Sequence, residues 1–192
     1  KGDPKLYDVY FGLGGYHYWR TARAGFIRAV AFWMPDRREL GLRQMELAAR
    51  HSRYIRNGAL HGIALSLYDA GEFERAVVFN TQVVGPIEPA TNGSLYMRGR
   101  LLARRQDWSN VEVTFKTLLE KLPPRSVGYQ VECKYWIARA SHELGREQDA
   151  REWAAEALAQ SETRQPDLEL ESALDTFGTI YQRLVALQQV LQ

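Results

Sequence analysis

The sequence lacks the features that mark several large classes of protein. It has one cysteine, Cys133, so it cannot form an internal disulfide, and a cysteine-rich zinc site is excluded. It contains no run of about 18 apolar residues, so no membrane-spanning helix is predicted. Strand signals are scarce, because apolar and polar residues nowhere alternate over a long stretch. What is present is a chain of 192 residues, 45% of them hydrophobic, which is enough to bury a sizeable core.

Motifs for catalysis and for metal binding are missing as well. The histidines form no His-Glu-x-x-His pattern; they are His17, His51, His61 and His142. No nucleophile motif of the GxSxG or Ser-x-x-Lys type occurs. His142 lies nine residues after Cys133, which is about 13 Å along a helix and too far for a Cys–His pair. We therefore expect no catalytic residue, no bound metal and no cofactor.

The stretch YFGLGGYHYWR, residues 10–20, places three glycines within four positions. A phosphate-binding loop would need a strand before the glycines and a Lys-Ser/Thr pair after them, and the sequence has neither. Each glycine inside a helix costs about 1 kcal/mol relative to alanine. We therefore interpret the glycines as positions where a neighbouring helix approaches closely.

Charge is unevenly distributed although the net charge is only +2. Residues 1–105 hold 16 Lys and Arg against 9 Asp and Glu, whereas residues 106–192 hold 9 against 14. An arginine-rich half is suited to acidic peptides, anionic lipid or nucleic acid. An ordinary solvated surface gives the same pattern.

Apolar residues recur at intervals of three and four along most of the chain, which predicts amphipathic helices joined by tight turns. The segments 59–89, 94–124 and 133–162 align with one another at steps of 35 and 39 residues. Three positions align. The first is a small residue of the first helix (Ala64, Gly99 and Ala138), the second is a turn residue (Gly71, Gln106 and Gly145), and the third is a residue of the second helix (Ala76, Val111 and Ala150). Such internal repetition predicts stacked helical hairpins.

These positions resemble the tetratricopeptide repeat, a family of paired helices. Further matches are an aromatic residue before the second helix at Phe73 and Trp108, a closing proline at Pro89 and Pro123, and the residues Phe115 and Ala157. The resemblance implies an all-α fold, a right-handed α-solenoid of antiparallel helical hairpins. The N-terminal region is also similar to uncharacterised bacterial helical-repeat proteins, many of them extracytoplasmic. The predicted location therefore stays open between a bacterial periplasmic or other extracytoplasmic space and the cytoplasm.

We expect a single repeat domain over residues 1–192. Its predicted parts are an irregular N-terminal hairpin (5–52), three repeats (57–90, 92–124 and 131–163) and a C-terminal capping helix (167–192). The last segment carries an apolar stripe at alternating steps of four and three: Leu170, Leu174, Phe177, Tyr181, Leu184, Gln188 and Leu191. This helix is predicted to cap the third repeat, with a homodimer through the same face as the alternative.

The resemblance implies a binding surface on exposed positions of the first helix of each hairpin. Projected onto this sequence, these positions are His61, Leu65, Tyr68, Tyr96, Arg100, Arg104, Tyr135, Arg139 and His142. Tyrosine offers rigid contact area with a polar tip, and arginine offers a fork for carboxylates. The alternative is that these residues pack within the chain. The two-carboxylate clamp for chaperone tails is not expected, because its positions hold His61, Leu65, Met97, Glu132 and Trp136.

These features favour a non-catalytic protein–protein interaction scaffold for a protein or peptide partner with acidic groups, and not an enzyme. Two alternatives remain, an RNA-binding helical repeat and the recognition arm of a larger enzyme. Glu132 and Glu143 on the third inner helix argue against a continuous track for nucleic acid phosphates.

Overall fold

The computed structural model describes residues 4–23, 35–84, 90–169, 172 and 174–192. Over these residues the chain forms helices and no strands, so the predicted all-helical fold is confirmed. The helices are α1 (Pro4–Ala22), α3 (Arg38–His51), α4 (Arg56–Asp69), α5 (Phe73–Val83), α6 (Asn92–Arg104), α7 (Trp108–Lys121), α8 (Val127–Glu143), α9 (Glu147–Ser161), the short 3₁₀ helix η1 (Pro166–Leu168) and α10 (Phe177–Leu191). Residues 24–34, between α1 and Pro35, lie outside the described residues.

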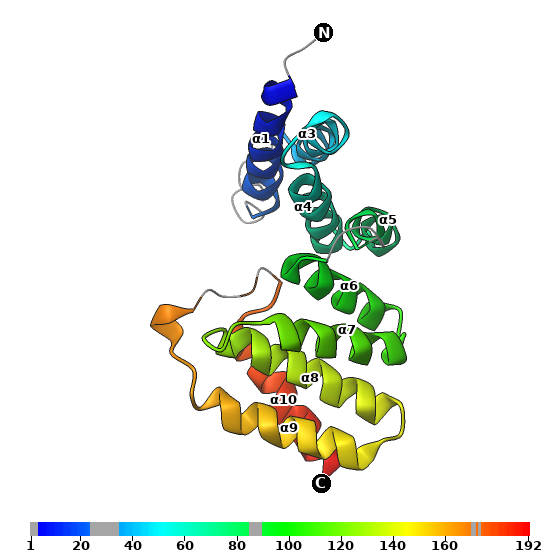
Figure 1. Ribbon diagram of the computed structural model, residues 1–192, viewed down its shortest axis with the longest axis vertical. Helices are drawn as coiled ribbons and strands as arrows, with labels where there is room; N and C mark the ends of the chain where they lie inside the picture. The colour runs from blue at the N-terminus through cyan, green and yellow to red at the C-terminus, as the bar shows by residue number, and fades with distance from the viewer. Residues whose placement is uncertain (1–3, 24–34, 85–89, 170–171, 173) are drawn as a thin grey trace. The chain divides into compact units, whose positions relative to one another are not determined.

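The chain divides into two compact units, residues 1–90 and residues 91–192. In the first unit α1 packs on α3, α3 on α4, and α4 on α5. In the second unit each helix from α6 to α10 packs on the next one along the chain, as Figure 1 shows. The boundary between the units falls between the predicted repeats 57–90 and 92–124.

The turn between the two helices of a hairpin has the same backbone geometry in all three predicted repeats. Gly71, Gln106 and Gly145 have φ angles of 79°, 57° and 75°, in the left-handed region. The residue after each of them donates its backbone N–H to a carbonyl five residues earlier, as Glu72 does to Leu67 over 2.8 Å. This is the hydrogen-bonding pattern of a Schellman motif, which satisfies the last carbonyls of the first helix. The positions that the sequence aligned are therefore structurally equivalent.

Small residues lie where the helices approach most closely. Ala64, Ala76, Ala138 and Ala150 are fully buried. At Gly99 an added Cβ would lie only 2.5 Å from the Phe115 ring, so glycine is required for this ring to pack.

The glycine-rich stretch of α1 contains one such close approach. A Cβ at Gly14 would lie 2.6 Å from the Gly41 carbonyl oxygen, and a Cβ at Gly41 would lie 2.5 Å from the Gly14 oxygen. The interpretation as a helix contact is therefore correct for Gly14. It is wrong for Gly12 and Gly15 within the described chain, where nothing lies within 4 Å of an added Cβ.

The C-terminal helix begins later than predicted. Residues 166–168 form a 3₁₀ turn, and α10 starts at Phe177 with Thr176 as its cap. Two carboxylates that precede it contact other elements: Glu169 accepts from the Gly128 backbone N–H over 2.6 Å, and Asp175 pairs with Arg100. The apolar face of α10 is buried against α8 and α9 through Ile180, Leu184, Leu187 and Leu191.

Candidate functional site

The structure gives the predicted binding residues very different exposures. Tyr68, Tyr96, Arg100 and Tyr135 are buried, so the expectation that they are exposed is wrong. The remaining residues are accessible to some degree: His61, Leu65, Arg139 and His142 are half-buried and Arg104 is exposed. The predicted strip is therefore not a continuous open surface.

Arg100 on α6 is the centre of a buried network in the second unit. It is 4% exposed, and its Nη1 atom donates to Glu132 Oε1 on α8 over 2.9 Å. Its Nη2 atom donates to Asp175 Oδ2 in the segment before α10 over 2.6 Å. The guanidinium also lies over the Trp136 ring, 5.1 Å from its centre. The carboxylates predicted for a partner at this arginine thus come from the chain itself.

Tyr96 and Arg183 complete the network. The Tyr96 hydroxyl donates to Glu132 over 2.9 Å and lies 2.7 Å from the Ser172 hydroxyl. Arg183 on α10 donates to Asp175 over 2.9 Å. Two arginines therefore face two carboxylates, which compensates charge that would otherwise be costly to bury.

Burial and charge pairing shift the pKa values of Glu132 and Asp175 in opposite directions. Burial raises the pKa of Glu132 above its ordinary value, although Arg100 and the hydrogen bonds from Tyr96 and Trp136 oppose this shift. Burial also acts to raise the pKa of Asp175, but the charges and hydrogen bonds of Arg100 and Arg183 outweigh it and lower that pKa. Asp175 is therefore the firmly ionised partner of Arg100.

Several other predicted binding residues have partners within the chain. His142 Nδ1 lies 2.9 Å from Glu147, Arg139 pairs with Glu143 and lies over the Trp108 ring, and the Tyr68 ring meets Phe73 edge-on. His61 differs, since its Nδ1 atom is buried without a hydrogen bond and burial lowers its pKa. His61 is therefore expected to be a neutral, half-buried histidine.

The described residues contain no group of three His, Cys, Asp or Glu side chains that could hold a metal ion. None of the described helices has the length and hydropathy needed to cross a bilayer. Cys133 is buried, and burial raises its pKa well above the usual value. A thiol in this state is a poor nucleophile.

Sequence reasoning missed an apolar face on α1. Leu6, Val9, Leu13 and Tyr16 are 42–61% exposed and recur at helical spacing. An open groove of about 660 Å³ runs along this helix, lined by Asp8, Val9, Phe11, Gly12, Leu13, Tyr54 and Ile55. The helical spacing of these side chains was the available signal.

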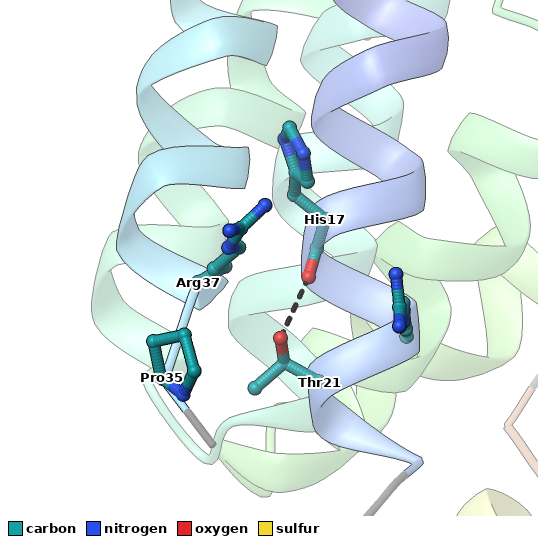
Figure 2. Close-up of a pocket in the computed structure, with 5 residues that line it drawn as sticks. His17, Thr21, Pro35 and Arg37 are labelled. Carbon is teal, nitrogen blue, oxygen red and sulfur yellow. Dashed lines mark hydrogen bonds between the residues drawn. The ribbon is translucent and has the colours of Figure 1, made fainter. Parts of the chain in front are cut away.

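Sequence reasoning also missed a basic pocket near the C-terminal end of α1. It has a volume of about 140 Å³ and is lined by His17, Arg20, Thr21, Pro35 and Arg37. In Figure 2 the Arg37 side chain extends from the segment before α3 toward His17 on α1. Residues from both sides of segment 24–34 meet here, so no local pattern in the sequence marks the pocket.

Comparisons of the chain with protein-family models, with curated proteins and with solved structures found no match.

Proposed function

We propose that this chain is a non-catalytic scaffold that binds a protein partner, built as a short right-handed solenoid of tetratricopeptide-like hairpins. The identical turns at Gly71, Gln106 and Gly145 support a repeated unit. Neighbour-on-neighbour packing within each unit is the contact pattern of stacked repeats.

The observation that carries the proposal is the apolar groove on α1. Large apolar side chains exposed together in a row are unusual on a soluble domain and mark interaction surfaces. Tyr54, which is 72% exposed, stands at the edge of the groove, and tyrosine is enriched in the centres of interfaces. A partner that covers these side chains would gain the free energy of removing them from water.

The occupant we propose is an amphipathic helix of the partner protein. Gly12 and Gly15 leave the backbone of α1 uncovered, since an added Cβ there would meet nothing within 4 Å. On its opposite side, α1 uses Gly14 to bring its backbone against α3 at Gly41. A helix laid along Gly12 would make an equivalent close contact while its apolar side chains fill the groove.

Charge at the edges of the groove indicates the polar face of that helix. Arg53 lies over the ring of Tyr54, which lines the groove, at 5.5 Å from its centre. Arginines held on aromatic rings are pre-organised to accept carboxylates. The partner helix is therefore expected to carry Asp or Glu beside its apolar stripe.

Site-specific photo-crosslinking tests the proposal. A photoreactive residue replaces Val9 in the full chain, and Val78 on α5 is the matched control because the two valines are 55% and 59% exposed. The expected result is one dominant adduct from position 9, whose crosslinked peptide is an acidic amphipathic helix, and no such adduct from position 78. A Leu13→Asp change should abolish the adduct. Equal adducts from both positions, or an adduct that survives Leu13→Asp, would refute the proposed groove.

A further inference from the structure

The basic pocket at the end of α1 has a chemistry that the α1 groove lacks. Its wall on α1 consists of His17, Arg20 and Thr21, and its other wall consists of Pro35 and Arg37. Two of these five side chains, Arg20 and Arg37, carry a positive charge. No carboxylate lines the pocket among the residues that the structure describes.

The nearest acidic residue on the Arg37 side is already engaged. Asp36 accepts hydrogen bonds from the Arg38 side chain at 2.7 and 3.0 Å and from its backbone N–H at 2.9 Å. Its charge is therefore neutralised by Arg38 rather than by Arg37. The sequence has no Asp or Glu between positions 24 and 34. Within the described chain Arg20 and Arg37 have no carboxylate partner, although Arg20 donates to the Tyr16 hydroxyl over 2.6 Å and lies over its ring.

The histidine is held in a fixed orientation. His17 Nδ1 lies 2.7 Å from Gln44 Oε1 on α3, and the amide oxygen can only accept, so Nδ1 carries a proton. The His17 backbone carbonyl accepts from the Thr21 hydroxyl over 2.9 Å, as the dashed line in Figure 2 shows. Gln44 engages Nδ1, which leaves Nε2 as the ring nitrogen available to a ligand.

We propose that this pocket binds the dianionic head of a phosphate monoester. A phosphate monoester carries a charge of about −1.5 to −2 near pH 7 and three terminal oxygens, each a strong acceptor. The pocket supplies two cationic donors, the Arg37 fork and the Arg20 guanidinium, whose Nη1 atom also donates to the Tyr16 hydroxyl over 2.6 Å. A carboxylate has two oxygens and one charge, and it would leave one of these cations without a partner. The inference does not depend on the partner proposed for the α1 groove.

Titration by NMR tests the proposal on the full chain at constant low ionic strength. The ring signals of His17 report on the pocket, and those of His61 serve as an internal reference because that ring is half-buried on α4. The probes are phenyl phosphate, a phosphoserine peptide, the same peptide without phosphate, and acetate. Both phosphorylated probes should shift the His17 signals saturably, with acetate and the unmodified peptide at least about tenfold weaker. Tighter binding of the phosphopeptide would assign the phosphate to a modified side chain, and equal binding to a free ester.

Two exposed arginines provide matched variants. Arg37→Gln removes the fork and should weaken phosphate binding at least about tenfold. Arg43→Gln removes another exposed charge, on α3, where Arg43 pairs with Glu39 at 3.9 Å. This variant should change the affinity for phosphate less than about twofold. Equal effects of the two variants would overturn the proposal. The absence of a saturable His17 shift over the titrated range of phenyl phosphate would overturn it as well.

Discussion

Replacing Arg100 by methionine should be one of the most destabilising single changes in the second unit. The change leaves Glu132, which is 2% exposed, without its cation, and it removes the stronger of the two partners of Asp175. Breaking a buried ion pair by removing one member costs about 3–5 kcal/mol, because the remaining charge stays buried without compensation. We therefore expect Arg100→Met to lower the free energy of unfolding of this unit by about that amount.

Arg183→Met is the matched control for this prediction. Arg183 contacts the same carboxylate of Asp175, but its side chain is 42% exposed. Exposed pairs contribute about 0–1 kcal/mol, so the control should lose no more than that. A double change of Arg100 to Met and Glu132 to Leu should recover most of the loss, since it also removes the unpaired charge.

Urea unfolding followed by the indole signal of Trp136 measures these effects in the full chain. This indole donates to Glu132 over 3.3 Å, so its signal reports on the second unit rather than on the first. The loss in Arg100→Met should shrink as the pH falls, because a buried carboxylate whose pKa is raised binds a proton more readily in the folded state than in the unfolded state. A loss equal to that of Arg183→Met, or a loss independent of pH, would refute the reasoning.

Three further predictions concern single positions. Gln106→Gly should stabilise the chain by about 0.5–1 kcal/mol in urea titrations, because glycine adopts a φ of 57° without strain. Gly99→Ala should cost about 1–3 kcal/mol through its clash with Phe115, whereas Gly12→Ala, where space is open, should add up to about 1 kcal/mol. The pKa of Asp175 is lowered in the folded state, so Asp175→Asn should lower the free energy of unfolding near pH 7. The difference in unfolding free energy between the variant and wild type should vanish as the pH falls well below 3.8. Equal pH profiles of Asp175→Asn and wild type would contradict the last prediction.

The repeated part of the fold was predictable because its signals are local. The turn residues and small residues recur at fixed offsets, and a Schellman turn needs a left-handed residue at one defined position. Gln106 occupies that position although it is not glycine, and the alignment with Gly71 and Gly145 identified it. Side-chain preference alone would have missed it.

The buried state of Tyr96 and Arg100 was not predictable in the same way. Their partners Ser172 and Asp175 follow 76 and 75 residues later in the chain. The sequence correctly indicated that Arg100 would attract carboxylates, but periodicity cannot tell whether these carboxylates belong to another molecule or to the same chain. The start of α10 at Phe177, in contrast, has a local signal, because Thr176 caps the helix and its hydroxyl accepts from the Thr179 backbone N–H.

The contact between α6 and the segment before α10 has a consequence for biosynthesis. A hairpin such as α8 and α9 can close as soon as its own residues leave the ribosome. Arg100 instead gains its partner only after Asp175 has left the ribosome. The apolar side of α8 and α9 is covered only after α10, which ends at Leu191, has left it. The second unit thus reaches its final state only when translation of this segment is complete, and a nascent chain stalled before residue 175 would expose both a charged and an apolar surface to chaperones and proteases.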